Sequence, residues 1–223
     1  MKNIIKNPEP TTLVEWKSNW PDLVPGWNEF DSNTKQTDGT SIKHKVKMAL
    51  LEEQGGLCCF CESEVSIDCG HIAHLLDRNG HPELALEYDN LLYSCPENEK
   101  RYKIPQTCGH AQGNRVLPIT PLADDCEQRF IYTATGAIAP RDENDVEAKQ
   151  TIEILNLNDR KAIFRKHRAK AFQTVDEARQ EKSPAEFEHW IDAELKRQSD
   201  GTFKPYWTTI KFAAGYYTPA WTK

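Results

Sequence analysis

The sequence lacks any run of about 18 apolar residues, the length that a membrane-spanning helix needs. Its opening, MKNIIKNPEPTT, also lacks the apolar core of roughly 7–15 residues that marks a secretory signal. Positive charge is not in excess, because 34 acidic residues outnumber 28 basic ones and give a net charge of −6. We therefore expect a cytoplasmic protein with no membrane contact. A uniformly basic surface is excluded, but a local basic patch is not.

The chain has 223 residues, which suits one domain with appendages or two small domains. Hydrophobic residues make up 38 % of it, enough at this length to form a packed core. No internal repeat or low-complexity tract is present. Local pattern divides the chain into an N-terminal arm (residues 1–40), a cysteine- and histidine-rich module (41–142) and a mainly helical C-terminal domain (143–223).

Several elements can be predicted from local pattern. Ser41 can cap a helix that runs through about Gln54 and stops at Gly55-Gly56. The segments 127–132 and 137–140 flank TATG and predict a β-hairpin. Beyond Asn144 the apolar spacing is helical, with helices over 159–180 and about 184–198. The predicted fold class is α+β.

The arm contains Trp16, Trp20 and Trp27 among prolines and charges. This is too aromatic for a disordered tail, so we expect the arm to pack on the core or on a partner. Stacking on nucleic-acid bases is the alternative.

Four of the seven cysteines have the spacing of a metal site. Cys58 and Cys61 are two residues apart, Cys95 follows after 33 residues and Cys108 after another 12. Disulfides are not expected in a reducing compartment, and four thiolates form a closed tetrahedral site for structural Zn²⁺. The alternative is that they are buried free thiols. The other three cysteines, which we predict to be core or surface residues, are Cys59, Cys69 and Cys126.

Histidine, asparagine and histidine follow one another within this cysteine framework, at His74, Asn90 and His110. The chain here resembles the HNH endonuclease family, which has a ββα-metal core with, in this case, a zinc knuckle. More narrowly, it resembles the PtuB-like HNH nucleases of Septu and retron antiphage defence systems. The segments that carry the resemblance are IIKNPEPTTLVEW at the start, LLEEQGGLCCFCE (50–62), HIAH (71–74), HPELALEYDNLLYSC (81–95), CGHAQGN (108–114), PLADDCEQRFIYTATGAI (121–138) and TIEILNLN (151–158).

The resemblance implies a nuclease module over 41–142 with defined roles. His74 would be the general base, because histidine titrates near neutral pH. Asn90 would tie the loop that holds this base, although it can equally serve only as a helix cap. His110 would be a ligand of the catalytic Mg²⁺ or Mn²⁺, with Asn114 as a further polar group near the ion.

The resemblance also implies partners and substrates. The expected partner is an ATPase of the ABC and SMC class, called PtuA, and some systems add a retron reverse transcriptase with its RNA and DNA. DNA is the default substrate of HNH enzymes, and RNA, including transfer RNA, remains open.

Two residues depart from the family pattern. Ala73 stands where the family has an acid, and Gln112 stands where it tends to have lysine. Alanine offers no oxygen to Mg²⁺. Three accounts fit Ala73: a deliberate inactivating substitution, which we favour, recruitment of another ligand such as His71 or Asp77, or loss of catalysis. The last account makes the chain a silent zinc-binding adaptor between an ATPase and nucleic acid.

A basic segment, DRKAIFRKHRAK, covers residues 159–170. Apolar positions supply an inward helix face, and the remaining positions form a cationic surface. We predict that Arg165, Lys166 and Arg168 contact phosphates. The alternative is an ordinary solvated helix face.

Overall fold

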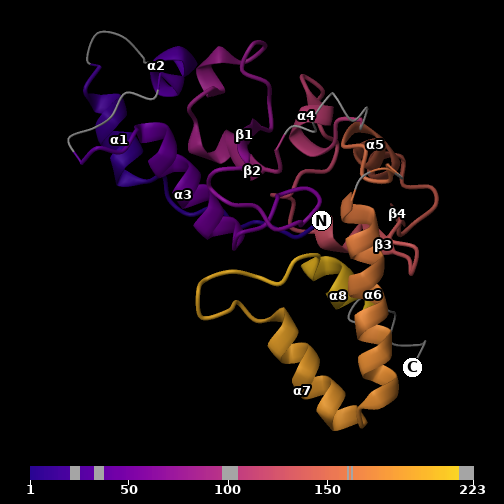
Figure 1. Cartoon of the computed structure of the whole chain (residues 1–223). Helices are drawn as coiled ribbons and strands as arrows, with labels where there is room; N and C mark the ends of the chain where they lie inside the picture. Colours follow the sequence, from indigo (N-terminus) through magenta and orange to yellow (C-terminus); the bar gives the residue numbers. More distant parts are fainter. Residues whose placement is uncertain (21–25, 33–37, 97–104, 160, 162, 216–223) are drawn as a thin grey trace.

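The computed structural model of the chain describes residues 1–20, 26–32, 38–96, 105–159, 161 and 163–215. Figure 1 shows the N-terminal helices and a small sheet at one end, and a long helical hairpin that projects from the other. Within the described residues, two separate two-stranded sheets are surrounded by helices and loops. The architecture is therefore mixed α and β, as the sequence predicts.

The N-terminal arm forms α1 (Thr11–Ser18) and α2 (Trp27–Asp31), which both pack on α3 (Ile42–Gln54). Ser41 caps α3 by accepting a hydrogen bond from the His44 amide at 3.2 Å, and Gly55 ends it in the left-handed conformation. The prediction for this helix is confirmed. The arm is packed on the core of the described chain, with Trp16 only 8 % exposed, while Trp20 is 36 % exposed.

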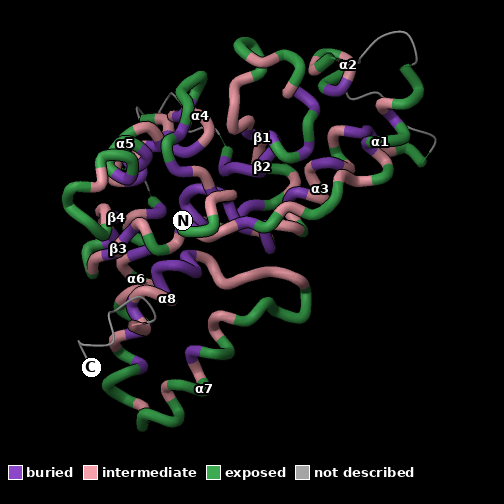
Figure 2. The backbone as a smooth tube through the Cα atoms, turned by 180° about the vertical axis from the view of Figure 1, so that it is seen from behind, coloured by how far each residue is buried: buried purple, intermediate pink, exposed green. Residues whose placement is uncertain are grey.

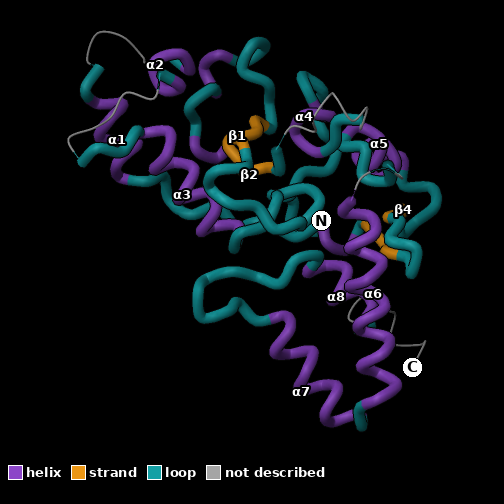
Figure 3. The backbone as a smooth tube through the Cα atoms, viewed as in Figure 1, coloured by secondary structure: helices purple, strands orange, loops and turns teal. Residues whose placement is uncertain are grey.

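The middle module contains a ββα unit. Strand β1 (His71–His74) pairs antiparallel with β2 (Leu91–Ser94), and the short helix α4 (Cys108–Gln112) packs on β1. Figure 3 shows these two strands beside α4. The 3₁₀ turns η1 (Pro82–Leu84) and η2 (Tyr88–Asn90) lie in the connection between the strands. On its other side, β2 packs against α3.

The predicted hairpin is confirmed. After the 3₁₀ turn η4 (Cys126–Gln128), strand β3 (Phe130–Tyr132) pairs antiparallel with β4 (Ile138–Pro140). Gly136 in the connecting turn has a φ of +73°, and a Cβ there would lie 1.9 Å from the carbonyl oxygen of Arg165. Glycine is therefore required both for the turn and for the close approach of α6 (Ile163–Glu181).

The C-terminal part is helical, as predicted. Helix α5 (Val146–Ile154) packs on β4, and α6 forms a hairpin with α7 (Pro184–Leu195). Helix α8 (Trp207–Ala213) packs against α6, α7 and β3. Figure 2 shows that α7 is largely exposed, whereas the buried residues are concentrated around the two sheets.

Helix α7 ends about three residues earlier than predicted, and the aromatic tail at 216–223 lies outside the described residues. No described helix is both long and apolar enough to cross a membrane.

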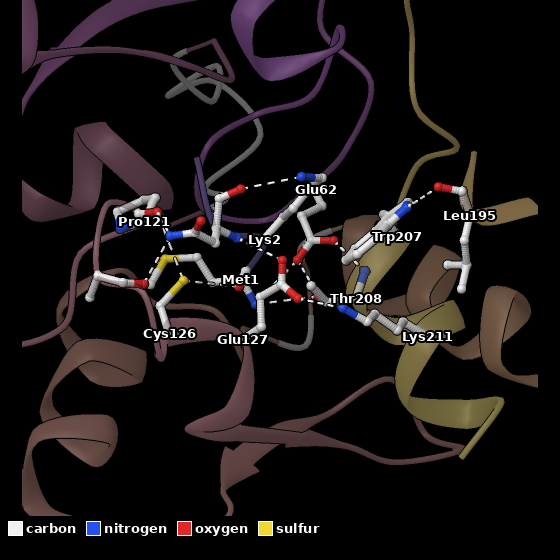
Figure 4. Close-up of polar contacts among 12 residues, drawn as sticks. Met1, Lys2, Glu62, Pro121, Cys126, Glu127, Leu195, Trp207, Thr208 and Lys211 are labelled. Atoms are coloured by element: carbon white, nitrogen blue, oxygen red, sulfur yellow. Dashed lines mark hydrogen bonds and ion pairs between the residues drawn. The ribbon is translucent and has the colours of Figure 1, made fainter. Parts of the chain in front are cut away.

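Contacts cross the predicted boundary near residue 142. The Glu62 carboxylate, 3 % exposed, accepts a hydrogen bond from the Thr208 amide at 2.7 Å and lies 3.2 Å from the ammonium group of Met1 (Figure 4). The Tyr206 amide also donates to the Glu62 carbonyl at 2.9 Å. One hydrophobic cluster includes both Met1 and Tyr206. The three-part division stays a prediction about folding units, and the parts share a core.

Candidate metal centre and active site

The four predicted ligand cysteines lie together. The sulfur atoms of Cys58, Cys61, Cys95 and Cys108 are all within 4.8 Å of one another, and all four residues are buried. They come from the loop after α3, from the end of β2 and from the start of α4. Four thiolates at about 2.3 Å from a tetrahedral Zn²⁺ would stand roughly 3.8 Å apart. The cluster could hold a metal ion, and its donors suit zinc.

Backbone groups shape this cluster before any metal binds. The Cys58 amide donates to the Ser63 carbonyl at 2.9 Å, and the Glu62 amide donates to the Cys58 carbonyl at 3.0 Å, closing the knuckle. The Cys95 amide donates to the Cys58 sulfur at 3.3 Å. Such N–H···S bonds stabilise a thiolate, so the cluster is prepared for a cation.

The thiols also perturb one another. Burial would raise the pKa of Cys58, but hydrogen bonds from Cys108, Cys59 and Cys61 outweigh burial and lower that pKa well below its ordinary value. Burial raises the pKa of Cys108 well above its ordinary value. One thiolate is therefore favoured, and full deprotonation of all four requires a bound cation. The remaining cysteines lie outside the cluster as predicted, Cys59 and Cys126 buried and Cys69 exposed.

His74, the predicted general base, lies at the end of β1 with one ring nitrogen fixed. Its Nε2 lies 3.0 Å from the Ala85 carbonyl oxygen, which can only accept, so Nε2 carries the proton and Nδ1 keeps its lone pair. The Trp27 ring meets the His74 ring edge-on, with centroids 4.7 Å apart. Burial lowers the pKa of His74 below its usual 6.5, so its imidazole is neutral at neutral pH. This is the state in which a histidine can accept a proton.

Asn90 joins both ends of the loop between the two strands. Its Oδ1 accepts from the Leu76 amide at 2.8 Å, and its Nδ2 donates to the carbonyls of Leu76 and Leu84 at 3.0 Å each. Asn90 is 7 % exposed. The loop that it closes also supplies the Ala85 carbonyl to His74, so Asn90 is well placed to hold the base.

Gln112 makes a second clamp that sequence reasoning missed. Its Nε2 donates to the carbonyls of His74, Leu75 and Arg115 at 3.1–3.3 Å. It is 2 % exposed, and its Oε1 has no hydrogen-bond partner among the described residues. An amide offers two donors to these three acceptors, whereas a lysine ammonium would offer three.

His71 and His110 lie next to each other on the face where β1 meets α4. Their ring centroids are 3.9 Å apart and the rings are tilted by 40°. The Nδ1 of His71 lies 2.8 Å from the Cys95 carbonyl oxygen. Burial and the neighbouring His110 lower the pKa of His71 to about 4, so it is neutral at neutral pH. The sequence predicts His110 as a ligand of the catalytic metal ion and offers His71 only as an alternative ligand.

The donors on this face do not match Mg²⁺. Ala73 lies beside His71 facing α4, since a Cβ built on Gly109 would be 3.0 Å from the Ala73 Cβ. The cysteine cluster is the one group of three or more His, Cys, Asp or Glu ligand atoms that meets among the described residues. Asp77 Oδ1 accepts from the amides of Asn79 and Gly80, and Asn114 is exposed beyond the end of α4. Mg²⁺ prefers oxygen ligands in octahedral geometry, which this face does not offer.

The basic helix differs from prediction at one of its three predicted residues. Arg168 is 2 % exposed, and its guanidinium donates to the carbonyls of Gly136 at 2.9 Å and Leu157 at 2.5 Å. It joins the hairpin to α6 and cannot contact a phosphate, so that prediction is wrong. Arg165 is half-buried and donates to the Asn158 carbonyl at 3.0 Å, whereas Lys166 is exposed. Positions 160 and 162 of this segment lie outside the described residues.

A second residue that sequence reasoning missed is Arg78. Its guanidinium lies over the Trp27 ring, 4.7 Å from the centroid, and that ring contacts His74. The positive charge of Arg78 also contributes to lowering the pKa of His74, after burial. The N-terminal arm thus places the Trp27 ring beside the predicted base, and the loop after β1 places the positive charge of Arg78 next to that ring.

Comparison with known proteins identifies two relatives. The chain is 31 % identical over 128 residues to the HNH endonuclease assigned to retron Vc95 of Vibrio cholerae serotype O1 biovar El Tor, a match covering 54 % of this chain and 61 % of that protein. It is 27 % identical over 129 residues to the Septu protein PtuB of Bacillus thuringiensis, covering 54 % of this chain and 45 % of that protein. The chain therefore spans about half the length of the curated relatives it matches.

No protein-family profile matches the chain. The two relatives agree with the resemblance carried by the cysteine framework and the His–Asn–His order. Over about half of its length the chain is thus similar to a retron HNH endonuclease and to a Septu PtuB protein, and these matches support a PtuB-like HNH family.

Proposed function

We propose that the chain is the nuclease subunit of an antiphage defence complex and hydrolyses phosphodiester bonds. The observation that carries the proposal is the tautomer of His74. Because Nε2 donates to the Ala85 carbonyl, Nδ1 is the basic nitrogen, and it belongs to a neutral imidazole. A positioned neutral histidine is what removal of a proton from an attacking water requires.

The neighbouring residues have supporting roles in this reaction. Nδ1 of His74 takes the proton of the attacking water. Asn90 holds the loop that carries the Ala85 carbonyl, and Gln112 holds the end of β1 that carries His74. Arg78 supplies a positive charge beside the base, where it can attract the phosphate diester.

The cysteine cluster has a structural role in the proposal. Its four buried sulfurs connect the loop after α3, β2 and α4, and Zn²⁺ is the ion that such a closed thiolate set suits best. Zinc binding would then be part of folding and would hold the ββα unit together.

The substrate and partners are proposed from the relatives' names. Septu PtuB supports a partner such as a PtuA-like ATPase of the ABC and SMC class, and the retron relative supports a reverse transcriptase with its RNA and DNA. DNA is the first substrate to test and RNA the second, because base-assisted hydrolysis does not depend on a 2′-hydroxyl.

A second candidate function is a silent zinc-binding adaptor between an ATPase and nucleic acid. Ala73 favours it, since this side chain brings no oxygen to the face where the ββα unit meets its helix. In this alternative the zinc cluster and the packed arm are kept for partner binding alone.

A cleavage assay on the assembled complex separates the two functions. The complex with its ATPase is incubated with DNA or RNA and with Mg²⁺ or a transition ion, using the chain as it stands and Ala73→Glu. We expect little cleavage with Mg²⁺ until Ala73→Glu restores a carboxylate. Absence of cleavage from both chains under all ions, with the ATPase bound and ATP varied, would favour the adaptor.

A further inference from the structure

We propose that His71 is a metal ligand and forms, with His110, a site that selects a nitrogen-preferring transition ion over Mg²⁺. The inference deepens the proposed function, because this would be the metal site of the nuclease. It departs from the family expectation of an oxygen-liganded Mg²⁺ or Mn²⁺.

The orientation of His71 is fixed by the zinc cluster. Its Nδ1 lies 2.8 Å from the carbonyl oxygen of Cys95, and a carbonyl can only accept, so Nδ1 carries the proton. The lone pair is therefore on Nε2. A metal-binding histidine usually has this arrangement, with one nitrogen donating to a carbonyl and the other directed to the ion.

Nε2 of His71 lies beside the start of α4. A Cβ built on Gly109 would lie only 2.8 Å from that nitrogen, so any larger residue at this position would collide with it. His110 is the next residue, and its ring centroid lies 3.9 Å from that of His71. The glycine thus lets the helix approach until the two imidazoles are neighbours.

The chemistry of these donors decides the ion. Imidazole is a borderline ligand that suits Zn²⁺, Ni²⁺, Co²⁺ and Cu²⁺, whereas Mg²⁺ requires oxygen. Ala73 lies beside His71 on this same face and contributes only a methyl group. A transition ion held by two imidazoles would keep water in its remaining positions, which leaves room for a phosphate oxygen.

The test measures metal binding directly on the full-length chain. Protein that holds one zinc per chain, the occupancy of the cysteine cluster alone, is titrated with Co²⁺, whose visible absorption reports its ligands, while zinc release is followed to confirm that the cluster stays loaded. We expect saturable binding of one Co²⁺ that a hundredfold excess of Mg²⁺ does not displace. His71→Ala and His110→Ala should each weaken it at least tenfold. His189→Ala, at an exposed position on α7, is the matched control.

Three results would overturn the inference: absence of binding beyond the cysteine cluster, unchanged affinity in His71→Ala, or displacement of Co²⁺ by Mg²⁺. Retained zinc content and circular dichroism show whether each variant is folded, and His71→Gln provides a second substitution of similar size. Failure of this inference and failure of the proposed function give different results. If the His71→Ala variant cleaves nucleic acid with Mg²⁺ as well as the unchanged chain does, only the inference about the metal site is refuted. If the chain binds Co²⁺ but cleaves no nucleic acid, only the proposed nuclease function is refuted.

Discussion

The cysteine cluster and the histidine face, formed by His71, His110 and Ala73, lie at the same end of the β1–β2 pairing but differ in completeness. His71 at the start of β1 is paired with Ser94, next to the ligand Cys95, while His74 at the end of β1 is paired with Leu91. The cysteine cluster has four buried donors of one kind. The histidine face has two neighbouring imidazoles and a methyl group.

We propose that this difference separates a site that holds the fold from a site that can exchange ligands. A structural zinc site fills all four positions with protein donors, and a catalytic site leaves positions for water and substrate. One hydrogen bond joins the two sites, because the carbonyl of the ligand Cys95 fixes the tautomer of His71. Loss of the closed site should therefore disturb the open one, whereas loss of the open site should leave the closed one intact.

The largest effect should follow removal of the closed site. Cys108→Ser, or a strong chelator, should release the metal and unfold the module. The reason is that binding contributes on the order of 10 kcal/mol in structural zinc peptides. Metal content and thermal unfolding measure this, with Cys69→Ser at an exposed position as the control. A variant with less than about half a zinc per chain that kept its melting temperature would contradict the structural role.

Next in size is the loss of the predicted base, His74, at the other end of β1. His74→Ala should reduce cleavage by a factor of about 10²–10⁴ while zinc and ATPase binding persist. Because burial lowers the pKa of His74, the rate should fall with acid only below the ordinary value of 6.5. The rate–pH profile of an active complex measures this. Exposing the ring by Trp27→Ala should move the acid limb upward toward 6.5, and an unmoved limb would assign the titration to another group.

A smaller effect concerns the Gln112 clamp on the end of β1. Gln112→Leu removes the side-chain donor to three carbonyls at the end of β1 and should destabilise the protein by about 1–3 kcal/mol. Gln112→Lys supplies three donors and should be neutral or stabilising. Denaturant unfolding of the two variants compares them directly. Equal destabilisation by both would show that side-chain volume, and not hydrogen bonding, determines this position.

The same comparison shows what the sequence could and could not predict. The sequence alone predicts the pairing of Cys58 with Cys61, because it depends on spacing. It also predicts the helix cap at Ser41, because that depends on local backbone preference. The family resemblance directed attention to His74 and Asn90, but the bond from His74 to Ala85 depends on how the loop closes. The clamp by Gln112 likewise depends on tertiary packing.

The prediction for Arg168 was wrong for a different reason. Helical spacing marked it as basic and therefore exposed, yet the glycine turn at 136 approaches α6 so closely that its carbonyl is within reach of the guanidinium. Charge alone did not distinguish a buried donor to backbone carbonyls from a surface cation. The two arginines and the lysine that the pattern grouped together therefore have different surroundings.

The smallest expected effect tests this distinction outside both sites. Lys166 is exposed and Arg168 is buried, so only the first can release counterions from nucleic acid. Lys166→Gln should leave thermal stability unchanged and lower the slope of log affinity against log salt by up to about 0.9 for one lost duplex contact. Arg168→Gln should lower the melting temperature and leave that slope unchanged in the folded fraction. Binding titrations at several salt concentrations measure both variants, with metal content as the check that neither site is disturbed. An unchanged slope in Lys166→Gln would make this face of α6 an ordinary solvated surface.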